Sequence, residues 1–376
     1  MLDRLRRGNS QKKAGKVKVF FAGTLMAAGG FFGFLGHQVQ FTWQDLFGSG
    51  IHKKEDSVYL YTLDRYVHWS GFVETRPNGT VSESQAYMML IAVGENDRTV
   101  FRHVWNWTKT HLQRGDGLFA WQYSNGKVTD WNAATDADTD IAYALHLAAR
   151  RWNMPQYDQE SKKILQGIWN NETKKVAGTR YVTAGNWTAG ESGATLNPSY
   201  LAPYAYRVFA QMDPSHDWME LVDSSYKIYS ECRGSAGLPT DWCRVDSHGN
   251  FTTNFQMNGE AASGYDWDAI RVPYRVALDY EYSKDPRALS FLKSMTVPLA
   301  FDWNKKGEIF ATYRSNGTAS VSYESGAHYA ALLPVWRILY PNATHTMYVQ
   351  KLSGADPSKY DFYNLAWMWL GMWESE

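Results

Sequence analysis

Residues 134–152 of the chain read ATDADTDIAYALHLAARRW. After the acidic start, apolar side chains recur at the three- and four-residue spacing of one helix face, at Ile141, Ala144, Leu145, Ala148 and Trp152. This spacing predicts an amphipathic helix with aspartates in its first turns.

Similar apolar stripes recur along the rest of the chain and predict about a dozen helices in total. The further stripes run through residues 57–67, 84–94, 99–111, 160–169, 200–211, 217–230, 268–281, 286–295, 325–338, 344–352 and 361–373. Alternating patterns typical of strands are few, and the candidates are Lys175 to Val182 and Ile309 to Tyr313. We therefore expect an all-α domain of six helical hairpins in a ring, although a non-toroidal helical bundle would give the same stripes.

Composition excludes one class of partner and favours another. The 376 residues carry no formal net charge, so we expect no nucleic-acid partner. Aromatic residues make up 15% of the chain, and several lie in polar, glycine-containing stretches such as Gly117 to Tyr123. Core packing accounts for many of them, but Trp121 in that stretch suits a flat ligand face such as a sugar ring.

The N-terminal residues differ from the remainder. Residues 1–18 are basic and residues 19–36 are uncharged and mostly apolar. This order is typical of an export signal or an uncleaved membrane anchor with its basic end in the cytoplasm. We expect residues 46–376 to form one folded domain, either secreted or held at the extracellular face of the membrane, and to be a monomer.

The only two cysteines, Cys232 and Cys243, lie in one glycine- and proline-containing loop. A disulfide is compatible with an exported chain, but spacing alone leaves it open. Two sulfurs without a nearby histidine pair do not make a zinc site, and we expect no metal or cofactor.

Acidic residues at helix starts are the candidates for chemistry. Glu83 lies in the segment 80–87, where Ser82 and Gln85 fit a capping box with Ser82 as N-cap. A helix start lowers a carboxyl pKa, so a general acid at Glu83 requires burial or a second carboxylate to outweigh the dipole.

Two further acidic segments follow along the chain. Asp136 and Asp140 share a helix face from which Asp138 points away, so the first two need cationic partners, a metal or a functional reason. In residues 264–275, Asp268 stands three residues before Arg271, which could orient it or hold it ionised.

In this order, the segments resemble glycoside hydrolase family 8. Residues 134–152 are similar to the family signature, with His146 at a position where an aliphatic residue or glycine is usual. Residues 82–87 resemble the family's Ser-Glu-Gly-Gln segment, with Ser84 in place of glycine. The segments 268–273, 197–200 and 117–121 resemble the family's Asp-Ala-x-Arg-x-Pro, Asn-Pro-Ser-Tyr and aromatic segments.

The resemblance implies an (α/α)6 toroid and an inverting hydrolase of β-1,4-linked sugar chains. By carry-over, Glu83 is the general acid and Asp268 the general base. Asp136, Tyr200, Arg271 and Trp121 bind the substrate or position water and base. An endo-β-1,4-glucanase is favoured, and a reducing-end xylose-releasing exo-oligoxylanase or a chitosanase is the alternative.

Two rival interpretations remain open at the level of sequence. The departures at Ser84 and His146 leave room for a non-catalytic carbohydrate-binding protein. A polysaccharide lyase or a sugar epimerase would share a helical toroid.

Overall fold

The structure is a computed structural model that describes residues 55–373 apart from residue 258. The basic segment 1–18 and the apolar segment 19–36 lie outside these residues, so their expected roles stay predictions. Within the described part of the chain, no helix is long and apolar enough to cross a membrane.

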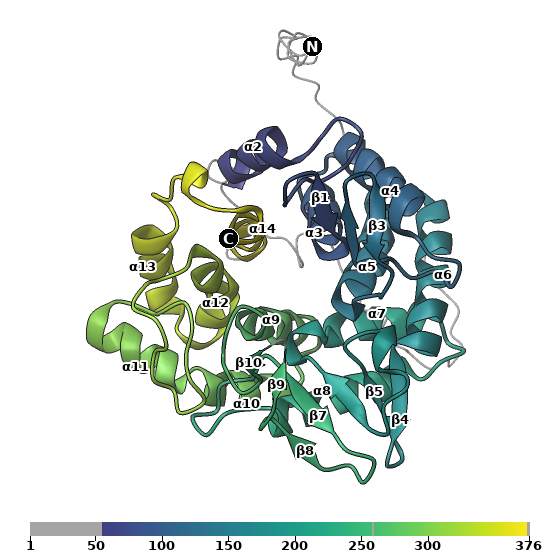
Figure 1. Cartoon of the computed structure of the whole chain (residues 1–376). Coiled ribbons are helices and arrows are strands. Elements are labelled where there is room, and N and C mark those ends of the chain that lie inside the picture. The colour runs from purple at the N-terminus through teal and green to yellow at the C-terminus, as the bar shows by residue number, and fades with distance from the viewer. Residues whose placement is uncertain (1–54, 258, 374–376) are drawn as a thin grey trace, which may run out of the picture. The chain divides into compact units, whose positions relative to one another are not determined.

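Helices dominate the described residues, and twelve of them form six pairs (Figure 1). The inner members are α3 (Ser82–Gly94), α5 (Thr135–Trp152), α7 (Pro203–Met212), α9 (Val272–Ser283), α12 (Gly326–Leu339) and α14 (Phe362–Trp373). Their outer partners, in the same order, are α4 (Arg98–Leu112), α6 (Pro155–Asn171), α8 (Trp218–Glu231), α10 (Pro286–Met295), α13 (Pro341–Lys351) and α2 (Glu55–Tyr66).

The inner helices close a ring. Helix α3 contacts α5, α7 contacts α9, α9 contacts α12, α12 contacts α14, and α14 returns to α3. Helices α5 and α7 meet through the rings of Tyr143 and Tyr204, whose centroids are 5.3 Å apart. The all-α prediction is thus confirmed, and these contacts favour the ring of hairpins over an open bundle (Figure 1).

The burial of the helices follows their place in the ring. Inner helix α12 is buried along most of its length, as expected for a helix with neighbours on all sides. Outer helix α4 buries one stripe that includes Phe101, Val104, Trp105 and Leu112. Helices α12 and α14 pack so closely at Gly371 that only a glycine fits. A Cβ at this position would lie 2.0 Å from the Ala330 carbonyl oxygen.

Short antiparallel strands connect the helices at several places. The two three-stranded sheets are β1 (Gly79–Val81), β2 (Gln122–Ser124) and β3 (Lys127–Asp130), and β6 (Ala194–Leu196), β7 (Cys243–Val245) and β8 (Phe251–Thr252). The two-stranded pairs are β4 (Thr173–Val176) with β5 (Thr179–Val182), and β9 (Gln256–Met257) with β10 (Glu260–Ala261).

Three expectations about elements need correction. Residues 175–182 are not one strand but most of the β4–β5 hairpin, which turns at Ala177 and Gly178 with φ of 48° and 86°. Residues 309–313 make only isolated bridges, through Phe310 and Tyr313. A helix that the stripes did not predict, α11 (Val297–Lys306), follows α10.

Cys232 and Cys243 form a disulfide, with Cα atoms 5.7 Å apart. It joins the residue after α8 to the first residue of β7. The bond therefore closes the loop that leads from an outer helix into the second three-stranded sheet.

Candidate active site

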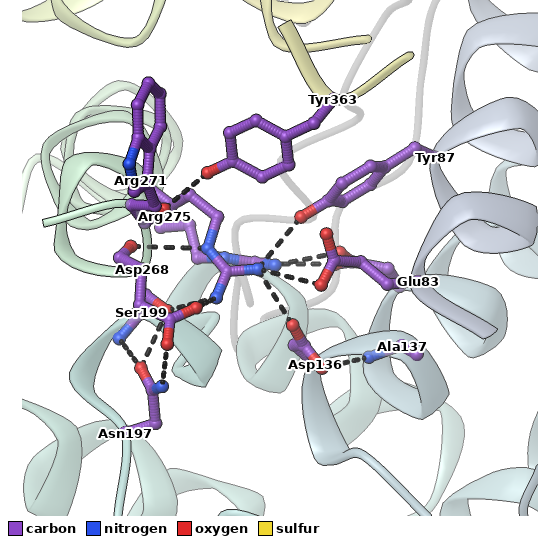
Figure 2. Close-up of polar contacts among 12 residues, drawn as sticks. Glu83, Tyr87, Asp136, Ala137, Asn197, Ser199, Asp268, Arg271, Arg275 and Tyr363 are labelled. Carbon is purple, nitrogen blue, oxygen red and sulfur yellow. Dashed lines mark hydrogen bonds and ion pairs between the residues drawn. The ribbon is translucent and has the colours of Figure 1, made fainter. Parts of the chain in front are cut away.

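Three acidic side chains from distant segments converge at one end of the ring. Glu83 lies in the first turn of α3 and Asp136 in the first turn of α5. Asp268 directly precedes the 3₁₀ helix η4 (Ala269–Arg271), which leads into α9. All three thus lie at or just before the starts of inner helices, and Figure 2 shows them around one guanidinium, that of Arg271.

Arg271 links the three carboxyl groups while its side chain is only 1% exposed. Its Nη1 lies 2.9 Å from Asp136 Oδ2 and 3.4 Å from Glu83 Oε2, and its Nη2 forms an ion pair with Asp268 Oδ1. Nη1 also donates to the Tyr87 hydroxyl at 3.0 Å. Burying this cation is tolerable because its donors are satisfied and carboxylates surround it.

The environment of Glu83 favours its protonated form. Burial raises the pKa of Glu83 to about 7, and the charges of Asp136 and Asp268 add to this, whereas Arg271 acts in the opposite direction. The single positive charge of Arg271 already lies beside the carboxyl groups of Asp136 and Asp268. An additional negative charge on Glu83 is therefore disfavoured. Burial is therefore the largest influence on Glu83, and it outweighs the neighbouring cation.

Asp268 is held from two sides and stays partly open. Its Oδ2 accepts from Asn197 Nδ2 at 3.0 Å, while Arg271 binds the other oxygen. Asn197 is itself oriented by Ser199, whose N–H and hydroxyl donate to Asn197 Oδ1 at 3.0 and 2.7 Å. The Asp268 side chain is 29% exposed, so this fixed carboxylate can still reach solvent.

Asp136 is almost completely enclosed. Its second oxygen accepts from the Ala137 N–H at 2.8 Å, and its side chain is 1% exposed. Burial raises the pKa of Asp136, and the positive charges of Arg271 and Arg275 oppose this rise.

The predicted geometry of the aspartate cluster is confirmed. Asp140 lies on the same face as Asp136 and forms a buried two-point ion pair with Arg275, with oxygen-to-nitrogen distances of 2.9 and 2.8 Å. Asp138 points elsewhere and accepts from the Phe119 N–H at 2.9 Å. Two arginines thus supply the partners that like charges on one helix face require.

Tyr200 borders the carboxylate cluster, and Trp121 is linked to the Glu83 segment through its backbone. The Arg271 guanidinium carbon lies 5.4 Å from the centroid of the Tyr200 ring. The Trp121 carbonyl accepts from the Ser82 N–H at 2.9 Å, so the Trp121 backbone is bonded to the residue before Glu83. The structure therefore brings five of the six predicted site residues together, and it places the backbone of the sixth, Trp121, beside the residue that precedes Glu83.

The expected capping box is wrong. Val81, not Ser82, is the N-cap of α3, and it makes no side-chain cap bond. Ser82 instead gives its N–H to Trp121. The Gln85 side chain is used elsewhere, since it accepts from the Val73 N–H at 2.8 Å and donates to Thr108. Pairing of the β1 segment with the Trp121 segment takes the place of local capping.

The two departures from the family pattern are accommodated. The Ser84 hydroxyl lies 3.3 Å from the hydroxyl of Thr75, which gives the added side chain a polar contact. His146 Nδ1 lies 2.8 Å from Asp158 of α6. This contact ties α5 to its outer partner.

Sequence reasoning missed several side chains of the site. Tyr87 lies one helical turn after Glu83, and that spacing alone was a usable signal. Asn197 and Ser199 lie in the same segment as Tyr200, where Asn197 contacts Asp268 and Ser199 orients Asn197. Tyr363 reaches the site from α14, where its hydroxyl donates to the Trp267 carbonyl at 2.5 Å (Figure 2), and no sequence signal announced it.

Comparisons with known proteins agree with this geometry. The model of the family described as glycosyl hydrolases family 8 matches residues 71–375. Endoglucanase A of Acetivibrio thermocellus is 33% identical over 241 residues, which cover 60% of this chain and 47% of that protein. A β-glucanase of Niallia circulans is 29% identical over 311 residues, covering 76% of this chain and 74% of that protein.

Solved structures show the same fold. The apo structure of a β-1,3-1,4-glucanase from Paenibacillus sp. X4 superposes with a TM-score of 0.76 at 23% identity, covering 85% of this chain and 90% of that one. The chain spans about half the length of several curated relatives that it matches.

Proposed function

The chain belongs to glycosyl hydrolase family 8, and we propose that it is an inverting endo-β-1,4-glucanase that uses Glu83 as general acid and Asp268 as general base. The observation that carries the proposal is the shared guanidinium of Arg271, which brings two acidic side chains 185 positions apart in sequence into one site.

Glu83 protonates the glycosidic oxygen as the bond to the anomeric carbon breaks. A carboxyl with a pKa of about 7 carries its proton in mildly acidic solution and is still about half protonated in neutral solution, as a general acid must be. The charges of Asp136 and Asp268 contribute to that pKa. The leaving sugar departs with the proton of Glu83.

Asp268 removes a proton from the water that attacks the opposite face of the sugar. An inverting enzyme needs roughly 6.5–9.5 Å between its two carboxyl groups to admit this water. Glu83 and Asp268 contact different nitrogens of Arg271 and lie on either side of it in Figure 2. No hydrogen bond joins the two carboxyls within the described residues, which is compatible with an intervening water.

The remaining site residues bind the sugar chain and orient the reacting groups. Asp136 hydrogen-bonds the sugar next to the scissile bond and, through its charge, helps to keep Glu83 protonated. Arg271 pairs with Asp268 and orients its carboxyl group, and Tyr200 positions the attacking water. Trp121 stacks on a sugar ring.

The substrate assignment to β-1,4-glucan is supported by the names of several relatives, endoglucanase A of Acetivibrio thermocellus among them. Export of the enzyme is part of the proposal, with residues 19–36 as anchor or signal and the catalytic domain outside the cell as a monomer. The Cys232–Cys243 disulfide supports an oxidising location.

The decisive experiment is a product profile on defined cello-oligosaccharides, with the anomer of the first product assigned by NMR. We expect internal cleavage with inversion by the wild type, and losses of about 100-fold or more in kcat for Glu83→Gln and Asp268→Asn. Retention of the anomer would exclude the mechanism. Equal background signal from wild type and Glu83→Gln on glucan, xylan and chitosan would favour a binding protein.

A further inference from the structure

The disulfide-closed loop, residues 232–243, is organised by its own hydrogen bonds. The Gly234 N–H donates to the Leu238 carbonyl at 2.8 Å, and the Thr240 N–H donates to the Cys232 carbonyl at 3.1 Å. With the disulfide, these contacts fix the geometry of the last residues of the loop, among them Asp241.

The end of this loop is bonded to the segment that carries Asp268. The Asp241 N–H donates to the Gly264 carbonyl at 2.8 Å, and the Trp242 N–H donates to the Ala262 carbonyl at 3.1 Å. These two backbone bonds place the Asp241 side chain beside the turn that precedes η4.

Asp241 binds that turn on both sides of Asp268. A single oxygen, Oδ1, accepts from the Asp266 N–H at 3.0 Å and from the Ala269 N–H at 2.8 Å. The backbone at Asp268 is therefore fixed from before and after by one carboxyl group, while Arg271 and Asn197 fix the side chain.

We propose that Asp241 is a positioning residue for the general base Asp268, and that the Cys232–Cys243 disulfide braces the loop that presents it. The inference rests on the proposed function, since it assigns Asp241 a role only through Asp268.

The disulfide-closed loop also contacts Tyr200, which is proposed to position the attacking water. The Trp242 ring packs edge-on against the ring of Tyr200, with centroids 6.0 Å apart. The disulfide-closed loop thus contacts both the Asp268 segment and Tyr200. A shift of this loop would change the distance between the general base and Tyr200. Misplacement of reacting groups by about 1 Å can cost 100-fold in rate.

Hydrogen bonding, rather than charge, is the property of Asp241 that this role requires. Burial raises the pKa of Asp241 well above its usual range, and the neighbouring charge of Asp268 adds to the rise. An asparagine at this position keeps the accepting oxygen and carries no charge, so it should replace the aspartate with little loss. An alanine removes the acceptor and should not.

The test compares Asp241→Asn and Asp241→Ala on a soluble β-1,4-glucan, with folding checked by thermal unfolding. We expect Asp241→Ala to lower kcat by about 10- to 100-fold with KM nearly unchanged, and Asp241→Asn to stay within about threefold of wild type. A matched control is Asp97→Ala, because Asp97 Oδ1 also accepts two backbone N–H groups, those of Thr99 and Val100, at the start of α4. The control should lose stability and keep kcat.

A second measurement does not depend on activity. Amide hydrogen exchange at Asp266 and Ala269 should be faster in Asp241→Ala than in wild type or Asp241→Asn. The double variant Cys232→Ala/Cys243→Ala should show the same change with the loop unbraced, together with a lower kcat.

The outcomes separate the two proposals. If the wild type does not hydrolyse the glucan, the proposed function fails, while exchange still decides whether Asp241 holds the turn. Unchanged exchange and kcat in Asp241→Ala would overturn the inference, as would equal losses of kcat in Asp241→Asn and Asp241→Ala.

Discussion

The Arg271 guanidinium lies 3.4 Å from the Glu83 carboxyl, yet the pKa of Glu83 is raised to about 7. A cation at this distance would by itself lower the pKa. Burial comes first among the causes of the rise, and Asp136 and Asp268 contribute while each also pairs with the same cation. The site therefore favours the protonated form of Glu83 beside a cation, because burial and two neighbouring carboxyl groups outweigh that cation.

This arrangement predicts the pH dependence of the reaction. Glu83 acts in its protonated form, so kcat/KM should fall as pH rises through about 7. In Asp136→Asn the repulsion from one neighbouring carboxylate is gone, while Arg271 and Asp268 still face Glu83. The basic limb of the pH profile should then move to lower pH. A limb that stays in place or moves upward would contradict the assignment of Glu83.

Arg271→Met should disrupt the site and the fold together. Removal of the cation leaves Asp136 buried without its main partner, and loss of one partner from a buried pair typically costs about 3–5 kcal/mol. Denaturant unfolding at pH 7 should show a loss of this size. Arg271→Lys retains the charge but not the several contacts of the planar group, so it should recover part of the stability and little kcat. Wild-type stability in Arg271→Met would rule out this role.

The sequence predicted most of the helices and the shared face of Asp136 and Asp140, because both signals are local. Apolar spacing within residues 134–152 is enough to define α5, and the same spacing places Asp136 and Asp140 on one face. The convergence of Glu83 with Asp268 was inferred only through the family resemblance, since 185 positions separate them and no local pattern reports their contact.

Contacts between distant segments account for what sequence reasoning missed. Pairing of Ser82 with Trp121 displaced the expected capping box, because a backbone partner 39 positions away satisfies the N–H of Ser82. Asp241 carries no local signal, because its partners, Asp266 and Ala269, are backbone groups in another loop. Strands of two to four residues are too short for alternation to be recognised.

Trp121→Ala should weaken substrate binding more than it slows the chemistry. The ring is proposed to stack on a sugar, while only the Trp121 carbonyl, which the substitution retains, is bonded to the Glu83 segment. We expect KM to rise about tenfold, or ~1.4 kcal/mol, with a smaller change in kcat. Trp121→Phe keeps a flat ring, so its KM should lie between those of the wild type and Trp121→Ala. A lower kcat at unchanged KM would instead indicate that the ring supports Glu83.

The buried pair Asp138 and Glu172 should make stability depend on pH. Both side chains are fully buried, and burial raises the pKa of Glu172 to about 8 and that of Asp138 well above its usual range. The folded protein thus keeps a proton on Glu172 that the unfolded chain releases near pH 4.3. The stabilisation is complete below that pH and is lost as pH rises towards 8.

Glu172→Gln removes the part of this dependence that comes from Glu172, whereas burial of Asp138 remains. Between pH 5 and 8 the free energy of unfolding of the wild type should fall relative to the variant by more than ~1.4 kcal/mol, the equivalent of one pKa unit. Glu160→Gln is a control in which the pH dependence of stability should have the opposite sign. Although burial acts to raise the pKa of Glu160, hydrogen bonds from Lys109 and Lys163 lower it, so its contribution is lost at acidic pH. Parallel stability curves for wild type and Glu172→Gln would mean that Glu172 is ionised in the folded protein.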